Sequence, residues 1–352
     1  MSVGIHQVLA GAAPRDAITN HALCARKVIR AMGFRSEVFA DGAHLSRELP
    51  PDVMAHDQWD RVADVQDRAI LHYSIHSDAF GHVLDRAARV ALHYHNVTPP
   101  ELMWRDAPHI AFDCMNGRLR LADLAGAVDM SVADSQFNAA ELVDLGFPDP
   151  QVVGILRTSG VVVTHRRAAG GHPRLLFVGR GAPNKCQHDL VLAIAALRDI
   201  GVYANLRLIG SWGSNRGYLD RCQRLAEACG VQDQVHILNS VSDEDMAVEF
   251  AHADLFLCLS EHEGYGVPLV EAMEAGLPVV AYAAGAVPET VGTGGLLLDD
   301  KSPAMVAEAV AAVLDGALAD RMAQGRATQL RLHSAAATTT RLQAFVQEFS
   351  TC

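Results

Sequence analysis

Short apolar runs alternate with longer amphipathic stretches along almost the entire chain, and this alternation constrains the fold more than any other feature. In the first half we expect strands over residues 3–9, 37–40, 69–73, 90–94, 128–133 and 152–155. In the second half we expect them over residues 175–178, 205–209, 234–238, 254–259 and 278–282. Helical stretches lie between the strands, the clearest over residues 18–32, which stops at Gly33 as a helix commonly does. Such regular alternation predicts α/β layers built on parallel sheets.

The length of the chain predicts two domains, because 352 residues exceed what one hydrophobic core usually supports. Residues 164–173, Thr-His-Arg-Arg-Ala-Ala-Gly-Gly-His-Pro, lose all periodicity and are expected to be a linker. We therefore expect Rossmann-like domains over residues 1–163 and 174–325, facing each other across an interdomain cleft. In parallel α/β domains, ligands bind at the carboxyl ends of the strands, so the loops after the strands are where chemistry is expected.

Composition excludes several classes of protein. Half of the residues are apolar and a fifth are charged, which excludes intrinsic disorder. The 29 Lys and Arg against 41 Asp and Glu give a formal net charge of −12, which argues against electrostatic binding to nucleic acid or to an anionic bilayer. The seven cysteines form no C-x-x-C pair, so we expect free thiols rather than a disulfide framework or a zinc knuckle.

The sequence also carries no sign of an integral membrane segment. No apolar run reaches the roughly 18 residues of a spanning helix, and the first thirteen residues lack the basic region of a signal peptide. Four basic residues near one helix, Arg26, Lys27, Arg30 and Arg35, are interpreted as a solvated face, with contact to a membrane surface as the alternative. We expect a cytoplasmic protein, with peripheral association with a membrane as a further option.

The most informative motif covers residues 260–273, Ser-Glu-His-Glu-Gly-Tyr-Gly-Val-Pro-Leu-Val-Glu-Ala-Met, directly after an expected strand. Gly264 and Gly266 let backbone amides approach a ligand, and Pro268 suits the first turn of a helix, so unpaired N–H groups converge on an anion site. A carboxylate accepts hydrogen bonds from two vicinal hydroxyls, so Glu271 suits a ribose diol and Glu263 the hydroxyls of a second sugar. The alternative, that both glutamates only complement the helix dipole, does not explain the paired glycines.

The stretch from Glu263 to Glu271 resembles the E-x7-E signature of retaining glycosyltransferases with the GT-B fold, in particular glycosyltransferase family 4. Residues 176–185, Leu-Phe-Val-Gly-Arg-Gly-Ala-Pro-Asn-Lys, resemble the first strand of that family's donor domain, where an Arg and a following Lys bind the donor diphosphate. Those residues are Arg180 and Lys185 here, and Lys185 is one of only three lysines in the chain. Without this context both would be ordinary charges of an exposed loop.

The resemblance extends beyond these two segments. Residues 275–281 and 286–289 match the strand and loop that usually follow the E-x7-E helix, and residues 133–138 match a late segment of the N-terminal domain more loosely. Residues 94–99, Tyr-His-Asn-Val-Thr-Pro, resemble a loop that points a His, here His95, at the donor sugar. The family also implies that the last helix, within residues 326–352, returns to pack on the N-terminal domain.

One departure from the family affects the acceptor side. Many members carry a Gly-Gly pair after the first strand, whereas this chain has Gly11-Ala12-Ala13-Pro14-Arg15-Asp16-Ala17. Gly11 still permits a tight turn, and the following helix would direct its positive end at the ligand. Asp16 either faces the acceptor hydroxyl or serves as the N-terminal acid of the helix, and the sequence favours neither role.

The resemblance implies a retaining, metal-independent transferase that moves a sugar from a UDP- or GDP-sugar donor to a hydroxyl of a saccharide, glycolipid or small-molecule natural product. No cofactor is implied, because the nucleotide sugar is itself a substrate. The expected catalytic residues are Arg180, Lys185, Glu263 and His95. The expected donor-binding residues are Glu271, Gly264, Tyr265, Gly266, Val267, Gly179 and Gly11. Asp16 and Asn96 are expected on the acceptor side.

Two other classes remain open at this point. With 17 histidines in the chain, His93 and His95 on one strand face, near His72, His76 and Asp78, make a metal-dependent hydrolase conceivable. The simpler interpretation is that His93 packs in the core and only His95 reaches the ligand, so we expect no metal. Asp243, Glu244 and Asp245 are likewise interpreted as helix-capping acids after Ser242 rather than metal ligands. The second of these two classes is a GT-B protein that binds a nucleotide sugar without transferring it.

Overall fold

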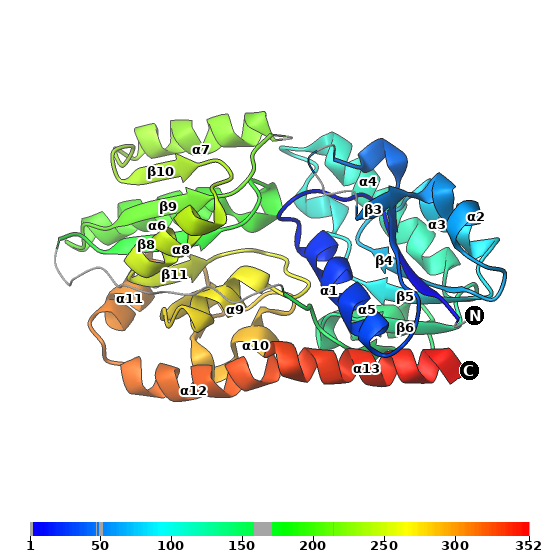
Figure 1. Cartoon of the computed structure of the whole chain (residues 1–352). Coiled ribbons are helices and arrows are strands. Elements are labelled where there is room, and N and C mark those ends of the chain that lie inside the picture. Colours follow the sequence, from blue (N-terminus) through cyan, green and yellow to red (C-terminus); the bar gives the residue numbers. More distant parts are fainter. Residues whose placement is uncertain (1–2, 47, 49–51, 158–170, 214, 352) are drawn as a thin grey trace. The chain divides into compact units, whose positions relative to one another are not determined.

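The computed structural model describes residues 3–46, 48, 52–157, 171–213 and 215–351, which form two compact units (Figure 1). Unit 1 comprises the described residues of 1–98, 112–159 and 333–352, and unit 2 those of 99–111 and 160–332. The expected linker, 164–173, lies outside the described residues except for 171–173.

Unit 1 is built on a seven-stranded parallel sheet with the strand order β3-β2-β1-β4-β5-β6-β7. Its strands are β1 (Ile5–Leu9), β2 (Val38–Ala40), β3 (Val53–Ala55), β4 (Arg68–Tyr73), β5 (Arg89–Tyr94), β6 (Met130–Ala133) and β7 (Gln151–Val152). The strand order reverses between β1 and β4, as in doubly wound sheets that carry helices on both faces. The α/β class with parallel sheets that the sequence predicts is therefore confirmed.

Helices and short 3-10 turns connect these strands. They are α1 (Ala17–Ala31), α2 (Trp59–Val62), α3 (Asp78–Leu84), α5 (Gln136–Asp144), α13 (Ala335–Thr351), η1 (Gly42–His44) and η2 (His56–Gln58). The turn η3 (Pro100–Leu102) belongs to unit 2, and α4 (Pro108–Asp123) contributes residues to both units. Helix α1 begins where the Asp16 carboxylate accepts the Thr19 N–H at 2.8 Å, and it buries Ala22, Ala25 and Ile29.

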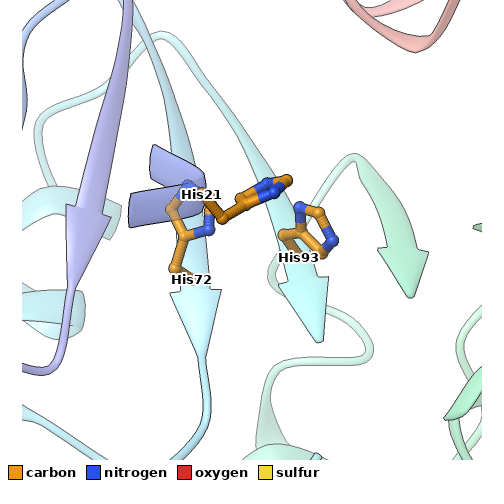
Figure 2. A group of neighbouring side chains, drawn as sticks. All are labelled: His21, His72 and His93. Atoms are coloured by element: carbon orange, nitrogen blue, oxygen red, sulfur yellow. The ribbon is translucent and has the colours of Figure 1, made fainter. Parts of the chain in front are cut away.

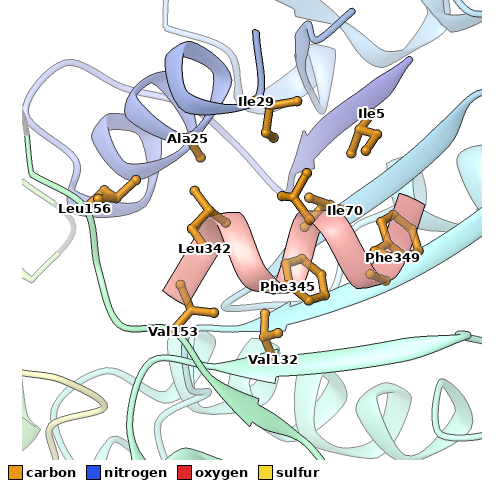
Figure 3. Close-up of a cluster of buried hydrophobic side chains, with 12 residues drawn as sticks. Ile5, Ala25, Ile29, Ile70, Val132, Val153, Leu156, Leu342, Phe345 and Phe349 are labelled. Atoms are coloured by element: carbon orange, nitrogen blue, oxygen red, sulfur yellow. The ribbon is translucent and has the colours of Figure 1, made fainter. Parts of the chain in front are cut away.

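The C-terminal helix α13 completes the core of unit 1 (Figures 1 and 3). Leu342, Phe345 and Phe349 are almost fully buried on one face of this helix. They lie in one cluster with Ala25 and Ile29 of α1 and with the strand residues Ile5, Ile70, Ala91 and Val132. Since residues spaced by three or four lie on the same side of a helix, this spacing gives α13 a continuous apolar stripe against the sheet.

Unit 2 has a six-stranded parallel sheet with the order β10-β9-β8-β11-β12-β13. The strands are β8 (Arg174–Val178), β9 (Asn205–Ile209), β10 (Val235–Leu238), β11 (Leu255–Cys258), β12 (Val279–Tyr282) and β13 (Leu296–Leu298). The helices are α6 (Gln187–Asp199), α7 (Arg216–Ala228), α8 (Asp243–His252), α9 (Val267–Glu274), α10 (Val287–Val291), α11 (Pro303–Leu314) and α12 (Ala319–Leu332), with the turns η4 (Pro183–Lys185) and η5 (Gly292–Gly294). The order reverses between β8 and β11, which is where such sheets bind ligands.

Truncating the central aromatic side chain of α13 tests its contribution to unit 1. Phe345→Ala removes a fully buried ring and should lower the free energy of unfolding of this unit by about 3–5 kcal/mol. Phe112→Ala, at a side chain 60% exposed, should change it by less than about 0.5 kcal/mol. Urea denaturation followed by circular dichroism measures both, and equal effects of the two variants would contradict the packing described here.

Candidate active site

The two loops singled out in the sequence leave neighbouring strands of unit 2. β8 and β11 pair in parallel, with Leu175 opposite Leu255 and Leu176 opposite Phe256. The loop of residues 179–186 after β8 and the loop of residues 259–266 after β11 therefore leave the same edge of the sheet. Helices that follow such neighbouring strands pass to opposite faces, so this edge is where a ligand can reach both loops. The sheet topology thus brings the two sequence motifs together.

Hydrogen bonds to backbone carbonyls fix these two loops. The Glu261 N–H donates to the carbonyl of Asn184 at 2.9 Å, which joins the loop after β11 to the loop after β8. The Gln187 side-chain amide donates to the carbonyl of Arg180 at 2.8 Å, and that of Asn215 donates to the carbonyl of Gly181 at 2.7 Å. Loops fixed in this way present their side chains in a defined geometry before any ligand arrives.

Lys185 and Glu263 form an ion pair across the reversal of strand order. The Lys185 Nζ lies 2.7 Å from the Glu263 Oε2, and the two side chains are 19% and 12% exposed. Arg180 lies near the start of the same loop and is exposed. Among the described residues its guanidinium makes no hydrogen bond or ion pair. The loop after β8 therefore carries one cation held by a carboxylate and a second that points to solvent.

The backbone of Glu263 is fixed by a third loop, the one that follows β12. The Ala286 N–H donates to the Glu263 carbonyl at 2.8 Å. Gly285 has a left-handed backbone with φ +59°, and a Cβ at that position would lie only 2.5 Å from the Glu263 carbonyl oxygen. Glycine is therefore required at 285 both by its backbone conformation and by the close approach of Glu263.

Gly266 starts helix α9 in a left-handed conformation, with φ +82° and ψ +53°. Gly264 and the buried Tyr265 lie in the turn before it, where the Tyr265 carbonyl accepts the Thr290 hydroxyl at 2.6 Å. Val267 is the first residue of α9, and Glu271 lies one turn further along the helix and is half-buried. The glycine loop thus delivers a helix N-terminus to the edge of the sheet that also carries Lys185.

Close backbone packing explains the remaining glycine of the expected donor site. The Gly179 N–H donates to the Ile209 carbonyl at 2.9 Å. A Cβ on Gly210 would fall 2.0 Å from the Gly179 carbonyl oxygen, and one on Gly181 would fall 2.1 Å from the Trp212 ring. Glycines in these loops let the chain ends of β8 and β9 approach each other more closely than side chains would allow.

Lys301 is a site residue that the motif analysis missed. It lies between β13 and α11, and its Nζ is 2.7 Å from both Asp189 and Glu261 and 3.3 Å from the Cys186 Sγ. Burial lowers the pKa of Lys301, but the hydrogen bonds to Asp189 and Glu261 outweigh it, so the pKa lies above its ordinary value. The scarcity of lysine in the chain is a signal that could have singled out this residue.

The expected residues of the first half of the chain lie in unit 1. Gly11 packs closely on η1, since a Cβ there would lie 2.9 Å from the Cβ of His44. Asp16 caps α1, and its Oδ2 accepts both the N–H and the hydroxyl of Thr19. Asn96 is buried with φ +74°, and its Nδ2 donates to the Oδ1 of Asn138 at 2.8 Å. Of the two roles expected for Asp16, the structure shows helix capping.

His95 belongs to a buried cluster at the carboxyl ends of β4, β5 and β6. Its Nδ1 lies 2.8 Å from the Asp134 Oδ2 and its Nε2 lies 2.8 Å from the Nδ1 of His72, so both ring nitrogens are bonded within the protein. His93 reaches the same carboxylate through its Nε2 at 2.9 Å. Figure 2 shows His21 of α1 meeting His72 and His93, with 4.8 Å between the ring centroids of His21 and His93. His95 is thus packed together with His93 rather than apart from it.

The cluster contains two sets of residues whose ligand atoms are close enough for a metal ion. They are His21, His72 and His93, and His93, His95 and Asp134. In the first set, the Nδ1 of His21 accepts the Leu156 N–H at 2.9 Å, so a neutral ring carries its hydrogen on Nε2 and offers no lone pair there. In the second set, the histidine N–H groups already donate to the carboxylate. The hydrogen bonds of His93, His95 and Asp134 therefore fit a polar network better than a metal centre, whereas the buried Nε2 of His21 has no hydrogen-bond partner among the described residues.

Burial determines the protonation of most of this cluster. It lowers the pKa of His21 and His72 well below the ordinary value of 6.5 and that of His93 to about 4. Burial alone would raise the pKa of Asp134. The neighbouring His95 and the hydrogen bonds from His93 and His95 lower this pKa by more than burial raises it, so the net shift is downward. His21, His72 and His93 are therefore neutral, and Asp134 is a carboxylate.

Comparison with known proteins identifies the second half of the chain. Residues 165–330 match the family model described as "Glycosyl transferases group 1". The limits of the match enclose the loops after β8 and β11, so the Lys185–Glu263 pair lies inside the matched segment.

Curated relatives match about half to two thirds of the chain. The chain is 34% identical over 176 residues to the GDP-mannose-dependent alpha-(1-6)-phosphatidylinositol monomannoside mannosyltransferase of Mycobacterium tuberculosis, which covers 47% of this chain and 43% of that protein. It is 28% identical over 247 residues to the D-inositol 3-phosphate glycosyltransferase of Corynebacterium efficiens, covering 65% of this chain and 58% of that protein. The chain thus spans about half the length of the curated relatives it matches.

Solved structures match over nearly the entire chain. Sucrose-phosphate synthase from Thermosynechococcus elongatus aligns with a TM-score of 0.79 at 17% identity, covering 99% of this chain and 100% of that one. Anabaena HepE, in complex with UDP and glucose, aligns with a TM-score of 0.74 at 18% identity, with the same coverage. These matches and the two parallel sheets confirm the GT-B fold expected from the sequence. Among the described residues, no helix combines the length and the apolar character that crossing a membrane requires.

The buried histidines predict a steep dependence of stability on pH. Burial depresses the pKa of His6, His21, His72 and His93, so the unfolded chain binds protons at these residues more readily than the folded one. Their contribution is complete above about pH 6.5 and is lost as the pH falls toward the folded values, by up to about 1.4 kcal/mol per pH unit for each histidine.

Urea titrations between about pH 7.5 and about pH 5 measure this slope. His93→Gln should reduce the slope by the contribution of one histidine, up to about 1.4 kcal/mol per pH unit. Stability that stays constant over this range in the unmodified protein would show that the histidines are not buried as described.

Proposed function

We propose that this protein is a retaining glycosyltransferase that moves a sugar from a UDP- or GDP-sugar to a hydroxyl of a saccharide, a glycolipid or a small natural product. The observation that carries the proposal is the Lys185–Glu263 pair, 2.7 Å apart where the strand order of the glycosyl transferase domain reverses. The N-terminus of α9 lies on the same edge of the sheet, after Gly266. A cation, a carboxylate and a helix N-terminus together fit an activated sugar that carries a diphosphate.

The positive charges act on the leaving group. As the bond between the anomeric carbon and the phosphate oxygen breaks, negative charge develops on the diphosphate and the sugar becomes oxocarbenium-like. Arg180 and Lys185 would stabilise this charge without a metal ion, and the exposed guanidinium of Arg180 is available for a phosphate. Lys185 is already oriented by Glu263, so little reorganisation is needed when the diphosphate binds.

Retention of configuration follows if the acceptor attacks from the face that the diphosphate leaves. The acceptor oxygen forms the new bond to the anomeric carbon, and its proton passes to the departing phosphate oxygen, so no separate protein base is needed. Glu263 would orient the donor sugar, and Asp16 and Asn96 are proposed for the acceptor side. The sugar contact expected of His95 is not proposed again, because its side chain is 1% exposed and both ring nitrogens are bonded within unit 1. Glu271, together with the glycine loop, would hold the nucleoside through its ribose hydroxyls.

The relatives leave both nucleotides as candidates. One is named as GDP-mannose-dependent, whereas HepE was crystallised with UDP and glucose. A thermal-shift screen against UDP-, GDP- and ADP-sugars separates them, because a ligand that binds only the folded state raises its melting temperature. A donor that stabilises the protein but releases no nucleotide with any acceptor would favour a binding protein over a transferase.

Replacing Lys185 tests the leaving-group role. Lys185→Ala should leave the fold intact and lower kcat/KM by about a hundredfold or more, since one preorganised contact of this kind contributes about 3–4 kcal/mol to the barrier. Lys27→Ala removes an exposed lysine of α1 and serves as the matched control with full activity expected. Nucleotide release measured with the donor found in the screen reports the result, and undiminished turnover of the Lys185 variant would refute the assignment.

Replacing Glu271 tests the ribose contact separately from catalysis. Glu271→Ala should weaken binding of the free nucleoside diphosphate roughly tenfold to a hundredfold, because hydrogen bonds to a charged group contribute about 1.5–3 kcal/mol. Glu308→Ala, at an exposed position of α11, is the control and should bind normally. Isothermal titration calorimetry measures the affinity of each variant for the nucleoside diphosphate. Equal affinities of Glu271→Ala and Glu308→Ala would remove Glu271 from the site.

A further inference from the structure

A chain of hydrogen bonds in unit 1 runs from β1 to the carboxylate of Asp134, and its donor and acceptor roles follow from its first member. Gln7 is fully buried on β1, and its Nε2 donates to the Ala22 carbonyl at 2.8 Å. This bond fixes the orientation of the amide, because only the NH₂ group can donate to a carbonyl. The Gln7 Oε1 therefore faces the Nε2 of His72, 3.0 Å away, as an acceptor.

The Gln7 amide determines the tautomer of His72. An amide oxygen only accepts, so the Nε2 of His72 must carry a hydrogen. In the described part of the chain a carboxylate, Asp134, contacts His95, whereas His72 bonds only the Gln7 amide and His95, so the positive charge of this pair belongs on His95. Burial likewise lowers the pKa of His72, so its Nδ1 keeps a free lone pair. That Nδ1 lies 2.8 Å from the Nε2 of His95, and a lone pair at this distance requires a hydrogen on His95.

The other side of the His95 ring requires a hydrogen as well. Its Nδ1 lies 2.8 Å and 3.0 Å from the two oxygens of Asp134, which also accepts the Nε2–H of His93 at 2.9 Å. A carboxylate has no hydrogen to give, so the Nδ1 of His95 donates. Both ring nitrogens of His95 then carry a hydrogen, and the ring is an imidazolium.

We propose that His95 is a buried imidazolium, held in that state by Gln7 through the tautomer of His72 and neutralised by the carboxylate of Asp134. Gln7 is then a positioning residue, which acts on His95 without touching it. The assignment of this charge is independent of the proposed function, because every contact that carries it lies within unit 1.

The groups around His95 support a single positive charge. His72 on β4 and His93 on β5 stack on its ring, with centroids 5.1 Å and 4.3 Å away, and His21 of α1 lies 5.5 Å away. Burial keeps these three rings neutral, and Asp134 after β6 is the negative group in contact with His95. A buried charge needs such a partner with its hydrogen bonds satisfied.

The competing arrangement places the shared proton on Asp134 and leaves His95 neutral. Aspartic acid is ordinarily a stronger acid than imidazolium by about 2.6 pH units, or roughly 400-fold, which favours the proton on the ring. The hydrogen bond from His93 to the same carboxylate adds to this preference, because it stabilises the charged form.

Nitrogen-15 NMR of the full chain labelled in histidine tests the proposal directly. We expect both ring nitrogens of His95 to show a directly bonded proton at about pH 8, above the ordinary histidine pKa of about 6.5. A His95 ring with one unprotonated nitrogen at this pH, or an Asp134 carboxyl carbon with the chemical shift of a carboxylic acid, would overturn the proposal.

Two substitutions of Gln7 test its role as the positioning residue. Gln7→Glu keeps an acceptor for the Nε2–H of His72, so His95 should keep both hydrogens. Gln7→Leu removes the acceptor and lets His72 move its hydrogen to Nδ1, so His95 should lose the hydrogen on Nε2 and become neutral at about pH 8. A doubly protonated His95 in Gln7→Leu would remove Gln7 from the mechanism. If that variant does not fold, the spectrum of the unmodified protein still decides the charge of His95.

These measurements separate the inference from the proposed function. The NMR signals report on His95 whether or not the protein transfers a sugar. A protein that shows the imidazolium but releases no nucleotide from any donor would contradict the proposed function and leave the inference standing. A neutral His95 in an active transferase would contradict the inference and leave the proposed function standing.

Discussion

The reversal of strand order in each sheet is the constraint on which the rest of the structure depends. Parallel strands need crossover helices, and where the order reverses the helices pass to opposite faces and leave the ends of two neighbouring strands uncovered. In unit 2 those strands are β8 and β11. Their loops bring the Lys185 Nζ to 2.7 Å from the Glu263 Oε2, although the two residues are 78 positions apart in the sequence (263 − 185). Glycines at 181, 210 and 285 let the surrounding backbone close tightly around this edge.

Much of the fold could be predicted from the sequence because buried parallel strands are continuous apolar runs. The strand expected over residues 175–178 is β8 (Arg174–Val178), and the one expected over residues 205–209 is β9 (Asn205–Ile209). The strands β3 (Val53–Ala55) and β13 (Leu296–Leu298) were missed, since three residues are too few to show a period. The strand expected over residues 152–155 is confined to β7 (Gln151–Val152).

The candidate site also has a part that the sequence predicts and a part that it does not. Loops with glycines at fixed spacing after a strand are local features, so Lys185, Glu263 and Gly266 could be singled out without a structure. The contacts of Lys301 with Asp189 and Glu261, and of Gln7 with His72, join residues far apart in the chain and leave no spacing to read. The His-x-His pair was visible, but its meaning depends on Asp134 and on the Leu156 N–H that fixes His21.

The position of α13 has a consequence for how the chain is made. Its apolar side belongs to the core that Ile5, Ile29 and Ile70 begin, yet more than 260 residues of chain are synthesised between Ile70 and Ala335 (335 − 70 = 265). A ribosome delivers the chain from its N-terminus, so the strands of unit 2 emerge while the sheet of unit 1 still has an uncovered apolar strip. During translation this strip stays uncovered until α13 has left the exit tunnel.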